Sequence, residues 1–223
     1  MPFNVLLLDY VDSICADVFE KRGINAHQPG KLTDSELKNS LANYDAMVVR
    51  SATTVNKELL DYADKLQVIG RAGVGVDNID IPAATTKGVL VMNTPDGNTI
   101  STAEHTCGMI IALARNIPQS VERVKSGGWD RKSFMGTEVH SKKLGIVGLG
   151  KIGSEVAVRM KEFGMDLYAY DPFTTKDHAK NLGVELVELD ELLARADFIT
   201  MHVPLTDKTR NVLSAENIAK TKK

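Results

Sequence analysis

The chain has 223 residues, of which 43% are hydrophobic and 25% charged, a profile typical of a globular protein with room for one large or two ordinary domains. Its 27 basic and 29 acidic residues leave a net charge of −2, without the basic surface that nucleic-acid binding requires. No apolar run approaches the ~20 residues of a membrane span, and the first residues lack the basic segment of a signal peptide. Two cysteines, Cys15 and Cys107, are too few for a disulfide framework and lack metal-ligand spacing. We therefore expect a cytoplasmic protein with no nucleic-acid partner, no membrane partner and no metal site.

The first hundred residues alternate between apolar runs and helical segments. The runs predicted as strands are residues 5–9, 24–27, 46–51, 66–73 and 89–93. The intervening segments carry signals of helix ends, namely Asp12 and Gly23, the capping box of Thr33 and Glu36, and Pro82 and Gly88. Continuous apolar strands that alternate with helices favour a parallel sheet covered on both faces. Five such strands predict an α/β, flavodoxin-like domain.

A long helix over 101–118 follows, and Pro118 is predicted to end or kink it. Residues 125–143 are glycine-rich, basic and aperiodic, which indicates a connection or an exchanged arm. Strand–helix alternation then resumes, with strands at 144–148, 166–170, 184–187 and 197–203, helices at 152–163 and 190–195, and a final helix capped by Ser214. The sequence therefore predicts a second parallel-sheet domain.

The start of this second domain contains three spaced glycines, Gly148, Gly150 and Gly153. A predicted strand precedes them, a predicted helix follows them, and Asp171 comes 18 residues after Gly153. This is the full fingerprint of a Rossmann-type dinucleotide fold, although a bare glycine turn without a ligand is the alternative. Gly148 permits the tight turn, Gly150 lets the backbone approach a pyrophosphate, and Gly153 lets the helix pack close to the sheet.

The backbone N–H groups of Lys151 and Ile152 are expected to point at the phosphates, helped by the helix dipole. Asp171 indicates which dinucleotide binds, because a carboxylate there accepts hydrogen bonds from the ribose 2′-hydroxyl and repels a 2′-phosphate. We therefore expect NAD rather than NADP. The predicted domains are residues 1–97 for substrate binding, 98–143 for a linking helix and arm, and 144–223 for an incomplete NAD-binding domain.

Polar residues also gather where strands of the first domain end. Arg50 and Ser51 follow one predicted strand, and Arg71 ends the next. After Arg71 comes a turn around Gly73, Val74 and Gly75. The last predicted strand is followed by a stretch that contains Asn98, Thr99 and Ser101. Ligands of open parallel sheets bind at this edge. Paired arginines hold a phosphate or carboxylate, and a glycine turn exposes N–H groups to an anion. A small anionic substrate is therefore expected.

Other roles remain open for some of these residues. Arg50 could instead be a surface ion-pair partner of Glu58 or Asp61. Asp77 and Asp80 are expected to cap or stabilise the turn in which they lie.

Five stretches together resemble the D-isomer-specific 2-hydroxyacid dehydrogenases: VVRSATTV, LQVIGRAGVGVDNIDIPAATTKGVLVMNTPDGNTISTAEHT, GWDRKSFMGTE, LGIVGLGKIG and DFITMHVPLTDKTRNVLS. The resemblance runs from Val5 to the last residue. The arginine–serine pair, the GRAGVGVDNID turn and the arm are the narrower signals, and they resemble the branch that acts on 3-phosphoglycerate. The resemblance implies NAD-dependent oxidation of 3-phosphoglycerate to 3-phosphohydroxypyruvate, the first step of L-serine biosynthesis, by a homo-oligomer.

Matched positions imply roles. Arg50 and Arg71 would hold the substrate phosphate or carboxylate. Backbone N–H groups at Val74 and Gly75 would hold the carboxylate. Arg131 and Lys132 of the arm would hold the phosphate. Some members have a threonine near the nicotinamide at the position of Val74, and this chain departs from that pattern. The cofactor would be lined by Lys151, Ile152 and Asp171, and flanked by His202, Val203 and Pro204.

The resemblance also implies a catalytic Arg, Glu and His, and all three would lie downstream of this chain. None of the five histidines (His27, His105, His140, His178 and His202) matches the catalytic one. The Rossmann-type fold normally has six strands, whereas four are predicted here, so residues 197–203 would form an exposed edge. We therefore expect a fragment of a longer enzyme, without catalytic residues and without dehydrogenase turnover of its own.

Two other functions remain open. One is a dehydrogenase or reductase for another 2-hydroxy acid, such as glyoxylate, lactate or 2-hydroxyglutarate. The other is a non-catalytic NAD-sensing module of the same superfamily. The two arginines and the basic arm favour a phosphorylated substrate.

Overall fold

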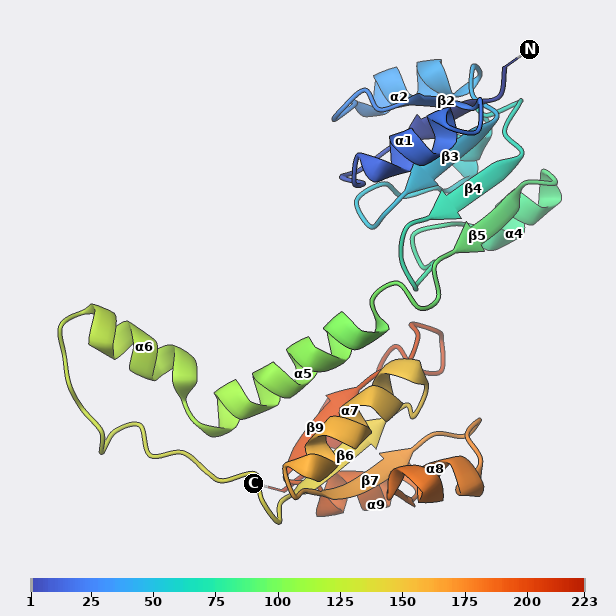
Figure 1. The fold of residues 1–223 in the computed structure, drawn as a ribbon. Helices are drawn as coiled ribbons and strands as arrows, with labels where there is room; N and C mark the ends of the chain where they lie inside the picture. The colour runs from blue at the N-terminus through green and yellow to red at the C-terminus, as the bar shows by residue number, and fades with distance from the viewer. Residues whose placement is uncertain (1, 223) are drawn as a thin grey trace. The chain divides into compact units, whose positions relative to one another are not determined.

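The computed structural model describes residues 2–222 and divides between Asn98 and Thr99 into two compact units. The first unit contains β1 (Asn4–Leu7), α1 (Ile14–Glu20), β2 (Asn25–His27), α2 (Asp34–Leu41), β3 (Ala46–Val49), α3 (Lys57–Leu60), β4 (Val68–Arg71), α4 (Ile81–Thr86) and β5 (Leu90–Asn93) (Figure 1). Its strands pair in parallel in the order β2-β1-β3-β4-β5. This is the flavodoxin-like order, so the predicted fold of this unit is confirmed.

Alternating residues of β1 supply the two cores of this unit. Leu6 packs in a cluster with residues of α2, α3 and α4, whereas Val5 and Leu7 pack with residues of α1. The sheet is therefore apolar on both faces, as expected for parallel strands covered by helices. The predicted capping box is confirmed, because the hydroxyl of Thr33 accepts from the Glu36 N–H while the Glu36 carboxylate accepts from the Thr33 N–H.

The second unit contains α5 (Thr99–Ala114), α6 (Ile117–Lys125), β6 (Lys143–Val147), α7 (Lys151–Glu162), β7 (Asp166–Tyr170), α8 (Lys176–Leu182), β8 (Glu185–Leu186), α9 (Leu189–Arg195), β9 (Phe198–Met201) and α10 (Ala215–Ala219). Its four strands are parallel in the order β8-β7-β6-β9. This order matches the first four strands of a Rossmann-type sheet, so the fold predicted for this unit is also confirmed. Within the described residues β9 pairs only with β6, which makes it the expected edge strand.

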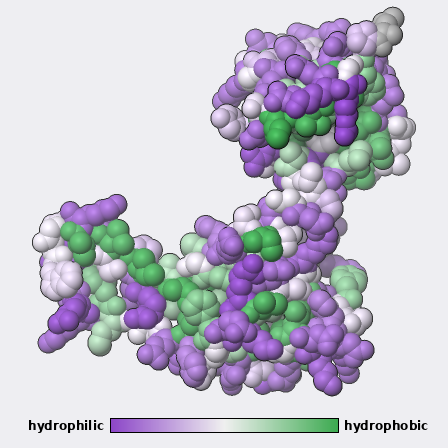
Figure 2. Space-filling model, viewed as in Figure 1, coloured by the Kyte–Doolittle hydropathy of each residue, from purple (hydrophilic) through white to green (hydrophobic). Residues whose placement is uncertain are grey.

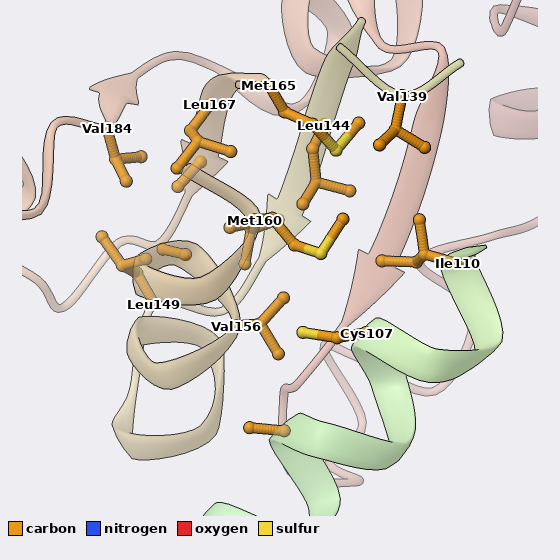
Figure 3. Close-up of a cluster of buried hydrophobic side chains, with 14 of the residues drawn as sticks. Cys107, Ile110, Val139, Leu144, Leu149, Val156, Met160, Met165, Leu167 and Val184 are labelled. Carbon is orange, nitrogen blue, oxygen red and sulfur yellow. The ribbon is translucent and has the colours of Figure 1, made fainter. Parts of the chain in front are cut away.

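Helix α5 forms part of the core of the second unit. Figure 3 shows Cys107 and Ile110 of α5 pointing toward Val156 and Met160 of α7, beside Leu144 of β6. The opposite face of the sheet is covered by α9, whose Leu192 and Leu193 are fully buried. Cys107 is thus a packed thiol, and burial raises its pKa above the ordinary value.

Two predicted helix ends are wrong. The helix predicted over 101–118 is two helices, because Asn116 adopts a left-handed backbone (φ 51°) between them. Pro118 lies in the first turn of α6, where its missing N–H costs nothing. At α1 the N-cap residue is Ser13 rather than Asp12, although the Asp12 carboxylate accepts the Ile14 N–H at 3.0 Å.

Two glycines of the second unit should respond oppositely to alanine. A Cβ at Gly145 of β6 would lie 2.5 Å from Leu192 Cδ2 and 3.0 Å from Ala196 Cβ, whereas one at Gly108 of α5 would meet nothing within 4 Å. We expect Gly145→Ala to lower the free energy of unfolding by about 1–3 kcal/mol through overpacking. Gly108→Ala should raise it by about 0.5–1 kcal/mol by restricting the unfolded chain. Urea titration of both variants checks this, and equal effects of the same sign would contradict the packing described for β6 and α9.

Candidate functional site

The glycine loop between β6 and α7 brings backbone unusually close to backbone. Gly148 has a φ of +95°, a conformation that side chains rarely allow. A Cβ on Gly153 would lie 2.1 Å from the carbonyl oxygen of Gly148, and one on Gly148 would lie 2.9 Å from that of His202. Glycine at both positions is therefore required by the fold, as the sequence predicted for the turn and for close helix packing.

The first turn of α7 is built to receive an anion. Gly150 is its N-cap residue, and no side chain among the described residues caps it. The Cβ position of Gly150 is open space, so a ligand can approach the backbone there. Lys151 and Ile152 begin the helix, where N–H groups and the helix dipole favour negative charge. These features fit the pyrophosphate of a dinucleotide.

Asp171, directly after β7, also binds the backbone of the glycine loop, a contact that the sequence did not indicate. Its Oδ2 accepts the Leu149 N–H of the glycine loop at 2.7 Å, and its Oδ1 accepts the N–H groups of Phe173 (2.8 Å) and Thr174 (3.2 Å). A carboxylate has roughly four acceptor positions. Asp171 can therefore hold the loop in place and still accept a hydrogen bond from a ribose hydroxyl.

The segment after β9 lies against the glycine loop. The His202 N–H donates to the Val147 carbonyl at 2.8 Å, and the His202 Nε2 lies 3.0 Å from the Thr200 hydroxyl. Burial lowers the pKa of the His202 imidazole below its ordinary value, which keeps the ring neutral near pH 7. Val203 is close enough to touch a Cβ on Gly148, and Pro204 is exposed. This placement agrees with a cofactor-flanking role for residues 202–204.

In the first unit, a cleft of about 570 Å³ opens at the carboxyl ends of the strands. Its lining includes the predicted residues Arg50, Ser51, Arg71 and Asn98, together with Gly73. It also includes residues that the sequence did not single out as ligand contacts, among them Tyr10, Val11, Asp12 and Cys15. We call this the arginine cleft. Val74 and Gly75 are not among its lining residues, and the Val74 carbonyl accepts from the Asn93 side chain at 2.7 Å.

Within residues 2–222, neither arginine of the cleft forms an ion pair with a carboxylate. Among the described residues, the Arg50 guanidinium donates to the Tyr10 carbonyl at 2.9 Å and forms no ion pair. The proposed alternative partners are wrong for Arg50, because Glu58 pairs with Lys38 at 2.7 Å and Asp61 with Lys87 at 3.4 Å.

Arg71 folds back over a glycine. A Cβ at Gly73 would lie 1.4 Å from Arg71 Nη1, so the guanidinium occupies the space that any side chain at position 73 would fill. Its Nε is buried and lacks a hydrogen-bond partner among the described residues. Because an unpaired buried donor is costly, Arg71 gains no stabilisation through its Nε within the described part of the chain.

The remaining predicted positions lie in the second unit. Arg131 and Lys132 are exposed in the irregular segment before β6, and the Lys132 N–H donates to the Asp130 carboxylate at 3.1 Å. Their contact with a substrate stays a prediction. No group of three or more metal-ligating side chains occurs within residues 2–222. In the same part of the chain, every helix is too short or too polar to cross a bilayer.

Comparison with known proteins identifies the family. Residues 107–223 match the family model described as D-isomer specific 2-hydroxyacid dehydrogenase, NAD binding domain. D-3-phosphoglycerate dehydrogenase from Synechocystis is 48% identical over 98% of this chain and 39% of its own length. The protein of that name from Methanocaldococcus jannaschii is 53% identical over 86% of this chain and 37% of its own length. The chain thus spans about two fifths of these relatives.

Solved structures agree on the fold. D-lactate dehydrogenase from Aquifex aeolicus, in complex with NAD and lactic acid, matches with a TM-score of 0.85 and 28% identity, covering 98% of this chain and 66% of that one. A glyoxylate reductase from Paecilomyes thermophila matches with a TM-score of 0.87 and 26% identity, covering 99% and 71%. The chain belongs to the D-isomer-specific 2-hydroxyacid dehydrogenase family, and NAD as its cofactor is confirmed.

Asp171 offers a direct test of cofactor choice. We expect Asp171→Asn to weaken NADH binding roughly 10- to 100-fold, since hydrogen bonds to a charged group contribute about 1.5–3 kcal/mol. The preference for NADH over NADPH should also shrink, because the charge that repels a 2′-phosphate is gone. Fluorescence titration of the purified chain with both nucleotides measures this. Asp177→Asn on α8 removes the same charge outside these contacts and is the control. Unchanged NADH affinity in Asp171→Asn would refute the role given to this carboxylate.

Proposed function

We propose that the chain is the substrate- and NAD-binding part of an enzyme that oxidises 3-phosphoglycerate to 3-phosphohydroxypyruvate, the first step of L-serine biosynthesis. The observation that carries this proposal is 48% identity, over 98% of the chain, to a protein named D-3-phosphoglycerate dehydrogenase. The arginine cleft supports it, because two arginines that have no carboxylate partner among the described residues suit a substrate with a phosphate and a carboxylate.

The residues of each unit take distinct roles in this proposal. When bound, NAD would accept the hydride from the hydroxyl-bearing carbon. Arg50 and Arg71 hold the anionic groups of the substrate, and the N-terminus of α7 holds the cofactor pyrophosphate. Asp171 orders the glycine loop and accepts from the adenosine ribose.

Hydride transfer from an alcohol also needs a base for the hydroxyl proton. No histidine among the described residues lines the arginine cleft. His27 contacts the Tyr44 hydroxyl, and His178 Nε2 lies 3.0 Å from the Ser154 hydroxyl. We therefore assign binding roles to this chain and no catalytic residue.

Other 2-hydroxy acids are the second candidate substrates. The structural neighbours named for lactate and glyoxylate share 28% and 26% identity with the chain. The phosphoglycerate-named relatives share about twice as much. The arginine cleft also favours a substrate with two anionic groups over lactate or glyoxylate.

Binding to the purified chain tests the substrate. We expect 3-phosphoglycerate to bind more tightly than lactate, glycerate or 2-hydroxyglutarate, as measured by calorimetry. Gly73→Ala should displace the Arg71 guanidinium. It should weaken 3-phosphoglycerate binding by about tenfold, because one charge-assisted hydrogen bond is lost. Gly70→Ala is the matched control, because its Cβ would meet Val48 Cγ2 at an ordinary 3.6 Å. Absence of 3-phosphoglycerate binding at millimolar concentration, with NADH binding intact, would overturn the proposed substrate.

We also propose that the protein forms homo-oligomers through α6. Figure 2 shows apolar side chains along this helix, which has no buried residue. Ile117, Val121 and Val124 lie on one face at helical spacing and are 42%, 45% and 56% exposed. Such a stripe is typical of an interface rather than of a solvated helix.

Light scattering of the purified chain measures the oligomeric state. We expect a defined oligomer at micromolar concentration, and dissociation in Val121→Glu/Val124→Glu, because burying two unpaired charges is costly. Gln119→Glu, on the opposite face of α6, should leave the mass unchanged. A monomeric wild-type chain would contradict this proposal.

A further inference from the structure

Asp9 and Asn78 hold the loop that carries Arg50 and Ser51. Asp9 follows β1, the loop follows β3, and Asn78 follows β4, so three carboxyl ends of neighbouring parallel strands meet here. Neither Asp9 nor Asn78 lines the arginine cleft. We propose that both are positioning residues that set the geometry of Arg50 for an anionic substrate, and this inference rests on the function proposed above.

The Asp9 carboxylate binds the loop at three points. Its Oδ2 accepts the Arg50 N–H at 2.6 Å and the Thr53 N–H at 3.2 Å, and its Oδ1 accepts the Thr53 hydroxyl at 2.6 Å. Asp9 itself has a φ of +58°, which few residues other than glycine, asparagine and aspartate adopt readily. The backbone at position 9 thus aims the carboxylate at the loop.

Asn78 binds the same loop from the other side. Its amide nitrogen donates to the carbonyl oxygens of Arg50 and Thr53, both at 2.7 Å. Next to it, the Val55 N–H donates to the Asn78 carbonyl at 2.8 Å. The backbone of residues 50–53 is therefore fixed at its N–H groups by Asp9 and at its carbonyl groups by Asn78.

This arrangement leaves the side chain of Arg50 for the cleft. Its backbone N–H and carbonyl are both taken, and its guanidinium is oriented by the Tyr10 carbonyl, which follows Asp9 in the chain. An ion pair with Asp9 would have cancelled the arginine charge. In the described part of the chain the Asp9 carboxylate accepts from two N–H groups and one hydroxyl group and forms no ion pair, so it positions Arg50 without neutralising it.

Substitution of two neighbouring aspartates, Asp9 and Asp12, distinguishes a positioning role from a purely electrostatic effect on anion binding. Asp12 lines the cleft and its carboxylate, among residues 2–222, accepts the Ile14 N–H alone, whereas Asp9 does not line the cleft and binds the loop. Each change to asparagine removes one negative charge near an anion site. On charge alone, both variants would bind an anion more tightly. The positioning role predicts the opposite for Asp9, and asparagine tolerates the left-handed backbone at that position.

The experiment compares Asp9→Asn, Asp12→Asn and Asn78→Ala in the purified chain. Calorimetry gives the affinity for 3-phosphoglycerate, and amide hydrogen exchange by NMR reports on Arg50 and Thr53. We expect Asp9→Asn and Asn78→Ala to weaken 3-phosphoglycerate binding by about tenfold each, and to speed exchange of these amides. Asp12→Asn, which removes a negative charge from the cleft lining, should bind 3-phosphoglycerate more tightly than wild type with unchanged exchange of these amides, and NADH affinity should stay constant in all three.

The possible failures are distinguishable. If wild type does not bind 3-phosphoglycerate, the proposed substrate fails, while the exchange rates still test the loop contacts. If wild type binds but Asp9→Asn binds equally well or better, the positioning role is refuted. Loss of the urea unfolding transition in Asp9→Asn would mean that Asp9 is a folding residue, and this too would overturn the proposal, unless Asn78→Ala folds and shows both effects.

Discussion

Parallel pairing of the strands is the constraint on which both candidate sites depend. Every pairing in the two sheets is parallel, so the strands of each sheet end at one edge. Residues that follow different strands therefore meet in space although they lie far apart in the chain. In the first unit this edge joins Asp9, Arg50 and Arg71, and in the second it joins the glycine loop, Asp171 and His202. The sites follow from topology before any side-chain contact is considered.

Close backbone contact links the fold of the second unit to its ligand. The carbonyl of Gly148 lies where a Cβ of Gly153 would be, which brings the start of α7 close to β6. The same proximity aims the helix N-terminus beyond the strand end, where an anion gains from the dipole. Asp171 then fixes the loop through the Leu149 N–H. Packing and cofactor recognition therefore share residues, and a change at any of them affects both.

Patterns local in sequence allowed most of the fold to be predicted. Strand–helix alternation indicated both sheets, and spacing identified the glycine turn and the arginines at strand ends. The helix end predicted at Pro118 was wrong because proline is compatible both with the end of a helix and with its first turn. Only the left-handed backbone of Asn116 distinguishes the two. Asp9 and Asn78 left no signal, since their bonds to the loop span 25 to 44 residues of sequence. Long-range contacts from side chain to backbone follow from the tertiary structure, which no local pattern specifies.

The acceptors around each arginine distinguish a binding arginine from a structural one. Arg195 donates to Glu185 at 3.1 Å and to Glu191 at 2.6 Å, and its ring contact with Tyr168 completes a neutralised surface cluster. Arg50, by contrast, donates to a backbone carbonyl, although the Asp9 carboxylate accepts its own N–H. A neutral acceptor orients a guanidinium without cancelling its charge, so the attraction for an incoming anion is retained. The protein has a carboxylate within reach of this loop and directs it to the backbone, and this leaves the charge of Arg50 available to a ligand in the cleft.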